Sequence, residues 1–106
     1  MKEVRRALAV RFAENLLRAR ERAGLSQEEV GFRALLHRTQ VGVLERGERL
    51  PRLDTIVKLA GGLSVSPCDL MRGMAWEQAE LSGGGFRLTD SDEATEEDHR
   101  EPARDD

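Results

Sequence analysis

Few residues in this chain have the types and spacing that catalysis needs. It contains two histidines, His37 and His99, one cysteine, and no carboxylates clustered at the spacing of metal ligands, so no metal site is expected. The glycines at 83–85 are not followed by the lysine and the serine or threonine of a phosphate-binding loop, and we interpret them as a flexible linker. We therefore expect no enzyme, no catalytic residue and no cofactor.

The chain is organised around the stretch from Leu25 to Gly47. This stretch reads as two short helices joined by a tight turn, with the polar run Arg38-Thr39-Gln40 at the start of the second helix. Such a run can bind a polar partner, or it can be a solvated helix surface.

The net charge of −3 combines two regions of opposite sign. Residues 82–106 hold nine acidic residues against three arginines, whereas residues 1–81 hold 14 basic and 11 acidic residues. The mildly basic body permits a polyanionic partner without requiring one. Charged residues make up 35% of the chain and aromatic residues 4%, which favours a small all-α protein with an aliphatic core over a β-sandwich.

Apolar periodicity predicts a long first helix, from about Glu3 to Ala23, that supports the central stretch. Gly24 is expected to end it in the left-handed conformation. The apolar residues of this helix recur at three- and four-residue spacing on one face: Val4, Leu8, Phe12, Leu16 and either Ala19 or Ala23.

The second helix begins with a capping box, in which Ser26 accepts a hydrogen bond from the backbone and Glu29 reaches back to the cap. Val30 and Ala34 are expected to face inward. Gly31 costs the helix about 1 kcal/mol relative to alanine, and the close approach of another helix is the expected compensation.

The remaining helices follow at short intervals. The third is predicted over 38–46, with Val41 and Leu44 buried and Gly47 at its end. A fourth starts near Asp54, and a short fifth starts at the Ser-Pro-Cys-Asp signal of residues 66–69. The apolar face of the fourth helix is expected to comprise Ile56, Val57, Leu59, Ala60 and Leu63.

Residues 74–88 allow two interpretations. They form either one helix or a loose hairpin, whose second strand is Phe86-Arg-Leu88 and whose connection is Ser82 to Gly85. Thr89 to Asp106 lacks apolar periodicity and is predicted to be disordered.

An ordered set of short motifs gives the chain a resemblance to a known family. Gly24-Leu-Ser-Gln-Glu-Glu, Leu-Glu-Arg-Gly at 44–47, Pro51 with Leu53-Asp-Thr55, Lys58-Leu-Ala60 and Val65-Ser-Pro67 with Leu70 occur in order and at the family's spacing. Over about Phe12 to Met71 the chain therefore resembles the phage-repressor-like (Xre/Cro type) helix-turn-helix DNA-binding family.

The resemblance implies a five-helix domain whose third helix enters the major groove of double-stranded DNA. It assigns base reading to Arg38, Thr39, Gln40 and Val43. Their chemistry suits the role, because arginine can bind guanine, glutamine can pair with adenine, and threonine or valine can contact a thymine methyl group.

Other residues are assigned positioning roles by the same resemblance. Gln27, Arg46, Arg49 and Arg52 match positions that meet the sugar-phosphate backbone, and such contacts position a domain without reading sequence. Arg20 and Glu45 match a family pair that forms an internal salt bridge, so their role would be structural.

Two residues depart from the family pattern. Leu35 stands where the turn between the second and third helices usually has glycine, and a left-handed leucine costs about 1–2 kcal/mol. We expect either a strained turn or a different path. His37 stands where a small polar residue usually caps the third helix.

We therefore expect a sequence-specific transcriptional regulator that reads DNA with helix 37–46, as a homodimer in the cytoplasm, with no membrane segment. Residues 1–72 would be the DNA-binding domain, 73–88 an extension with dimer contacts around Met71, Met74 and Trp76, and 89–106 an acidic tail. The alternative is an antitoxin-like or protein-interaction module on the same fold, with a protein partner bound through the tail.

Overall fold

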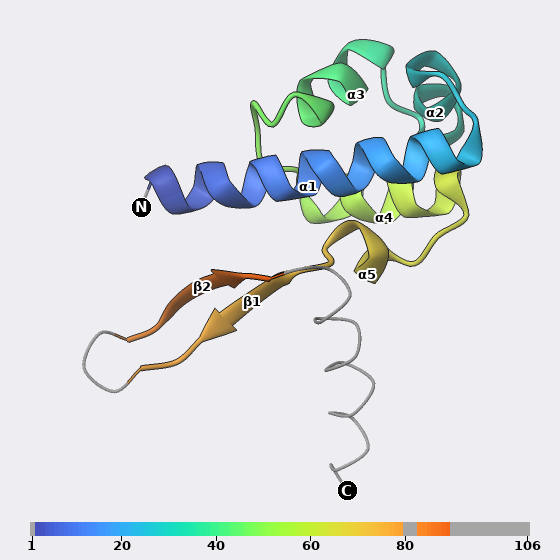
Figure 1. Ribbon diagram of the computed structural model, residues 1–106. Helices are drawn as coiled ribbons and strands as arrows, with labels where there is room; N and C mark the ends of the chain where they lie inside the picture. The colour runs from blue at the N-terminus through green and yellow to red at the C-terminus, as the bar shows by residue number, and fades with distance from the viewer. Residues whose placement is uncertain (1, 80–82, 90–106) are drawn as a thin grey trace, which may run out of the picture. The chain divides into compact units, whose positions relative to one another are not determined.

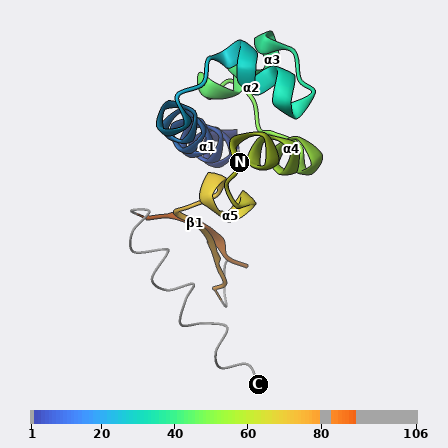
Figure 2. The same ribbon diagram turned by 90° about the vertical axis from the view of Figure 1, so that its right-hand side faces the viewer.

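In the computed structural model the chain forms two units, Met1–Met71 and Arg72–Asp106. The core of the first unit lies between its five helices. The structure describes residues 2–79 and 83–89. The helices are α1 (Lys2–Ala23), α2 (Gln27–Ala34), α3 (Arg38–Glu45), α4 (Leu53–Leu63) and α5 (Pro67–Leu70). Two views show α1 and α4 in a middle layer, with α2 and α3 on one side and α5 on the other (Figures 1 and 2).

The buried face of α1 begins later along the helix than the sequence predicts. Phe12 and Leu16 are buried as expected, and Ala9 and Ala13 join them on the same face. Val4 belongs to the predicted apolar face but is 38% exposed. The reason is that α3, α4 and α5 pack against α1, and the first turns of α1 extend beyond α3 (Figure 1).

One buried polar side chain ties α1 to α5. Asn15 is 5% exposed, and its Nδ2 donates a hydrogen bond to the carbonyl oxygen of Leu70 at 3.0 Å. This bond satisfies a group that would be costly to bury unpaired. It also fixes the end of α5, which starts at the predicted signal, where Ser66 and Asp69 form a capping box.

The apolar face of α4 follows the prediction with one exception. Ile56, Leu59, Ala60 and Leu63 are buried, but Val57 is 52% exposed. Because successive helical residues are about 100° apart, Val57 lies off the face that Ile56 turns to the core.

The second unit contains an antiparallel hairpin, so the hairpin interpretation of residues 74–88 is confirmed over the helix. Strand β1 (Met74–Glu77) pairs with β2 (Gly85–Leu88), which includes the glycine that we expected in the connection. The Trp76 and Phe86 rings meet edge to face, with their centroids 5.0 Å apart. The tail that we predicted to be disordered lies, beyond Thr89, outside the described residues.

No helix among the described residues is both long enough and apolar enough to cross a membrane.

Candidate nucleic-acid interface

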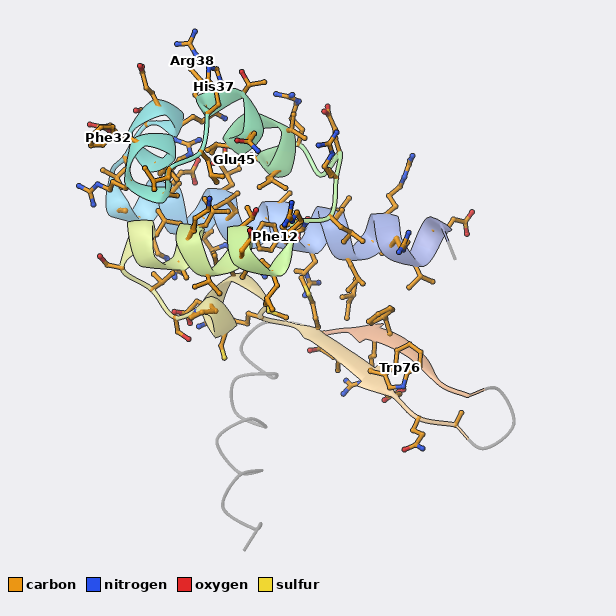
Figure 3. All side chains as sticks on the ribbon, turned by 180° about the vertical axis from the view of Figure 1, so that it is seen from behind. Phe12, Phe32, His37, Arg38, Glu45 and Trp76 are labelled. Atoms are coloured by element: carbon orange, nitrogen blue, oxygen red, sulfur yellow. The ribbon has the colours of Figure 1, made fainter. Side chains whose placement is uncertain are left out.

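The polar run of the central stretch lies on the outer face of α3. Arg38, Thr39 and Gln40 are exposed, whereas Val41 and Leu44 on the opposite face are buried. Arg38 and His37 point away from the body of the unit at the start of the helix (Figure 3). Val43, the fourth predicted base reader, is half-buried one turn later. The core thus anchors α3 by one face and leaves the first turn of the other free for a partner.

The turn before α3 is strained at Leu35. This residue is left-handed, with φ 57° and ψ 46°, and ends α2 at the position where the resemblance led us to expect glycine. Its side chain is 82% exposed and so gains little packing in exchange. Of the two outcomes that we expected, the structure shows the strained turn.

Gly31 makes this tight turn possible. A Cβ atom on Gly31 would lie 2.5 Å from the carbonyl oxygen of Leu36, which is closer than Cβ atoms come to non-bonded atoms in proteins. The same region is closed by the Leu36 amide, which donates to the Gly31 carbonyl oxygen at 2.8 Å. Close approach does explain this glycine, but the approaching group is the backbone of the turn and not another helix as we expected.

His37 caps α3 in place of a small polar residue. Its Nδ1 accepts a hydrogen bond from the Thr39 amide at 3.0 Å, in the position where a small polar residue would place its side-chain oxygen. The Oε1 atom of Gln40 accepts a hydrogen bond from the His37 amide at 3.1 Å, which completes a capping box. The side-chain oxygen of Gln40, a predicted base reader, therefore already accepts one hydrogen bond within the protein.

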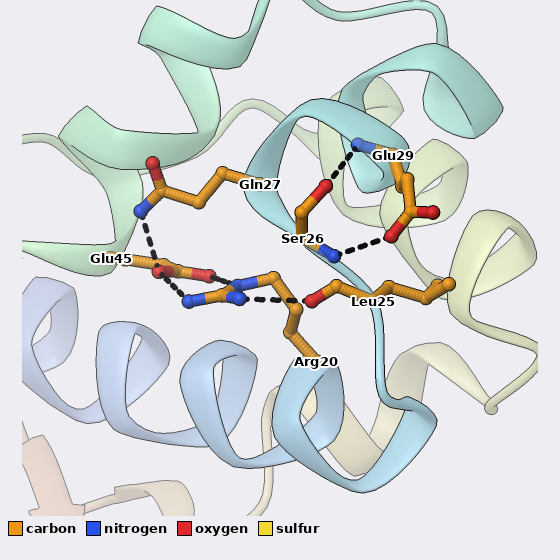
Figure 4. Close-up of polar contacts among 6 residues, drawn as sticks. All are labelled: Arg20, Leu25, Ser26, Gln27, Glu29 and Glu45. Atoms are coloured by element: carbon orange, nitrogen blue, oxygen red, sulfur yellow. Dashed lines mark hydrogen bonds and ion pairs between the residues drawn. The ribbon is translucent and has the colours of Figure 1, made fainter.

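Arg20 and Glu45 brace α3 against α1 (Figure 4). Arg20 donates from Nη2 to Glu45 Oε1 at 2.9 Å and from Nη1 to the Leu25 carbonyl oxygen at 2.9 Å. The hydrogen bond to Glu45 raises the pKa of Arg20 above its ordinary value. The two side chains are 18% and 6% exposed, which supports a structural role and not DNA contact.

Gln27 joins this brace. Its Nε2 donates to Glu45 Oε1 at 2.9 Å, so one amide hydrogen is engaged within the protein (Figure 4). The predicted phosphate contact of Gln27 therefore depends on its second amide hydrogen. The nearby cap of α2 forms as predicted: Glu29 accepts from the Ser26 amide at 2.7 Å, and this bond lowers the pKa of Glu29.

The three arginines predicted to contact phosphate lie on one loop after α3. Arg46, Arg49 and Arg52 are all exposed. Arg46 donates from Nε to Glu48 at 2.8 Å, a bond that raises the pKa of Arg46 and lowers that of Glu48. Arg52 lies 3.5 Å from Asp54. Two of the three cations are thus partly neutralised, and the sequence analysis did not anticipate either pair.

Two further arginines lie beside this loop. A cleft of about 710 Å³ separates the start of α1 from residues 46–50, and Arg5, Arg6, Arg46 and Arg49 line it. We call it the arginine cleft. Sequence reasoning missed Arg5 and Arg6 because they precede the motifs of the family resemblance. The only sequence feature that marks them is that two arginines are adjacent in the predicted first helix. Among the described residues, no cluster of histidine, cysteine, aspartate and glutamate could hold a metal ion.

Comparison with known proteins gives a consistent result. A family model described as helix-turn-helix matches residues 16–70. Control protein C.BamHI of Bacillus amyloliquefaciens is 42% identical over 50 residues, which make up 47% of this chain and 62% of that protein, less than two thirds of its length. An uncharacterized HTH-type transcriptional regulator, y4dJ of Sinorhizobium fredii, is 40% identical over 57 residues, or 54% of this chain and 74% of that one.

A solved structure also resembles the fold. The restriction-modification controller protein C.AhdI from Aeromonas hydrophila superposes with a TM-score of 0.59 and 42% sequence identity. The match covers 60% of this chain and 97% of that one. The family match ends at residue 70, before the hairpin begins.

Proposed function

The chain belongs to the helix-turn-helix family, and from that premise we propose that it is a sequence-specific DNA-binding transcriptional regulator. In this proposal α3 enters the major groove, Arg38, Thr39, Gln40 and Val43 face the base edges, and the arginines of the following loop contact phosphates.

The observation that carries the proposal is the two-faced character of α3. Arg38 and Thr39 are exposed at its first turn, while Val41 and Leu44 are buried and the brace through Glu45 holds its last turn. A helix fixed in this way presents donors and acceptors in a constant position, as readout of base edges requires. Exposed arginines beyond its end supply positive charge where the backbone would pass.

The test is selection of bound sequences from random duplex DNA. We expect the full chain to enrich a short motif, and Arg38→Ala to weaken binding and relax the preference at one base pair, at a cost of about 1–3 kcal/mol. Arg18→Ala is the matched control, because Arg18 is an exposed arginine on α1. The proposal fails if the wild-type chain enriches no motif, or if the two substitutions have the same effect.

A homodimer is part of the proposal. Of the residues expected to make dimer contacts, Met71 and Trp76 are 43% and 56% exposed, and Met74 is half-buried. Phe86, whose ring meets that of Trp76, is 44% exposed. Exposed apolar side chains are therefore available for a second copy. An inverted repeat in the selected motif, together with a dimeric mass in analytical ultracentrifugation, would support it. A monomer that enriches a single half-site would contradict it.

The two similar control proteins suggest which genes are regulated. C.AhdI is a restriction-modification controller protein, and we propose a corresponding role for this chain. The selected motif is expected upstream of restriction or modification genes beside its own coding sequence. A motif that lies only upstream of other genes would contradict this assignment.

A protein partner of the acidic tail is a separate proposal. Removing the residues after Thr89 keeps β2 intact, so the truncated chain tests the tail without disturbing the hairpin. Loss of a co-purifying protein would support the partner, whereas tighter non-specific DNA binding would show that the tail competes for the basic face.

A further inference from the structure

We propose that the arginine cleft binds a phosphate group of the DNA backbone, so that the start of α1 extends the DNA contact beyond α3 and its loop. The proposal rests on the proposed function and adds Arg5 and Arg6 to the surface that would meet DNA.

The first support is charge. Arg5, Arg6, Arg46 and Arg49 line the cleft and are exposed, and Glu48 is the one acidic residue among its lining side chains. Glu48 is engaged by Arg46 at 2.8 Å. Within the part of the chain that the structure describes, no acidic side chain forms an ion pair with Arg5, Arg6 or Arg49. Arginine suits phosphate because its planar guanidinium can donate two parallel hydrogen bonds.

The second support is rigidity. Gly47 is left-handed, with φ 72°, and a Cβ atom there would lie 3.3 Å from both Cα and Cγ2 of Val10. The loop therefore packs backbone against helix at the edge of the cleft. This contact fixes the backbone of the loop against that of α1, from which the arginines on the two sides of the cleft extend.

The third support is position. Arg46 and Arg49 directly follow α3 and are already candidate phosphate contacts, so the cleft continues the same surface. The start of α1 extends past α3 and this loop (Figure 1). A phosphate bound between them would lie at the margin of the DNA site and would carry no sequence information.

The test compares two double variants of the full chain that remove equal charge from α1. Arg5→Gln/Arg6→Gln removes both positive charges from the α1 side of the cleft. Arg18→Gln/Arg22→Gln removes two exposed arginines of α1 that do not line the cleft. Affinity for the selected duplex is measured across salt concentrations. The logarithm of the affinity falls linearly with the logarithm of the salt concentration, and each lost phosphate contact makes this slope less steep by about 0.9.

We expect the cleft variant to reduce the magnitude of this slope by about 1, as the loss of one phosphate contact requires, while selecting the same motif as the wild type. The control variant should change the slope by less than half as much. Shortening the duplex to the motif alone should remove the difference between the cleft variant and the wild type, because the marginal phosphate is then absent.

Glu48→Gln gives an effect of opposite sign. It removes the negative charge from the cleft and frees Arg46, so affinity for the long duplex should rise. Equal slopes for the cleft variant and the wild type, or equal losses in the two double variants, would overturn the proposal. These outcomes differ from failure of the proposed function, in which the wild type itself enriches no motif.

Discussion

Replacing Leu35 by glycine should stabilise the protein. The residue is held at φ 57° and ψ 46°, where a side chain with a Cβ atom costs about 1–2 kcal/mol. Its side chain is 82% exposed, so truncation removes little buried apolar area. Glycine loses about 0.5–1 kcal/mol more conformational freedom on folding, which offsets part of the gain. The expected net stabilisation is therefore about 0.5–1 kcal/mol.

The measurement is thermal and urea unfolding of the full chain at neutral pH. In a unit of this size each kcal/mol shifts the melting temperature by about 4–8 °C, so we expect an increase of about 2–8 °C. The slope of the urea transition should not change, because the surface exposed on unfolding is nearly the same.

Leu35→Ala is the matched control for this substitution. Alanine removes most of the same side chain but keeps the Cβ atom and hence the strain. We expect it to be no more stable than the wild type. If the alanine and glycine variants unfold together, backbone strain at Leu35 is not the cause, and the interpretation of this turn is refuted.

Three further predictions concern the surroundings of α3. Gly31→Ala should destabilise by about 1–3 kcal/mol in urea unfolding, because its Cβ atom would meet a carbonyl oxygen at 2.5 Å; a variant as stable as the wild type would contradict this. Glu45→Ala should cost about 3 kcal/mol in thermal unfolding because it removes the carboxylate that pairs with the largely buried guanidinium of Arg20, whereas Glu14→Ala, which breaks a more exposed pair, should cost about 0–1 kcal/mol. The lowered pKa of Glu29 stabilises the fold above its ordinary value of 4.5, and this stability is lost as the pH falls through the lowered value. Glu29→Gln should therefore lose less stability than the wild type between pH 7 and pH 3, and parallel losses in the two proteins would refute the assignment.

The caps and turns of this protein could be predicted from sequence because their determinants are local. Ser26 and Glu29 lie three residues apart and bond each other's backbone, and Ser66 and Asp69 repeat the arrangement at α5. Gly24 adopts φ 71°, as the end of a long helix predicts. Each of these features depends on a few neighbouring residues, so a short sequence pattern determines it.

Burial could be predicted less well because it depends on which elements of the folded chain cover each residue. Val4 fits the apolar spacing of α1 as well as Phe12 does, yet only Phe12 lies where other helices cover it. The same holds for Val57, which is apolar but lies off the packed face of α4. The arginine cleft could not be predicted at all, since Arg5 approaches the loop after α3 only in the folded chain.

The geometry of α3 has a consequence for how it would read DNA. Bidentate pairing with adenine needs both the oxygen and the nitrogen of a glutamine amide. One lone pair of the Gln40 oxygen accepts a hydrogen bond from the His37 amide, and this bond holds the side-chain amide at the start of α3 while the capping box is closed. Opening the box would free the oxygen at the cost of part of the cap, which is worth about 0.5–2 kcal/mol. Gln40 therefore meets a base either in the orientation that the capping box imposes or, after leaving the box, with a penalty, whereas the guanidinium of Arg38 has no such commitment among the interactions of the described residues. Sequence preference should consequently depend more on Arg38 than on Gln40, although both lie in the first turn of α3.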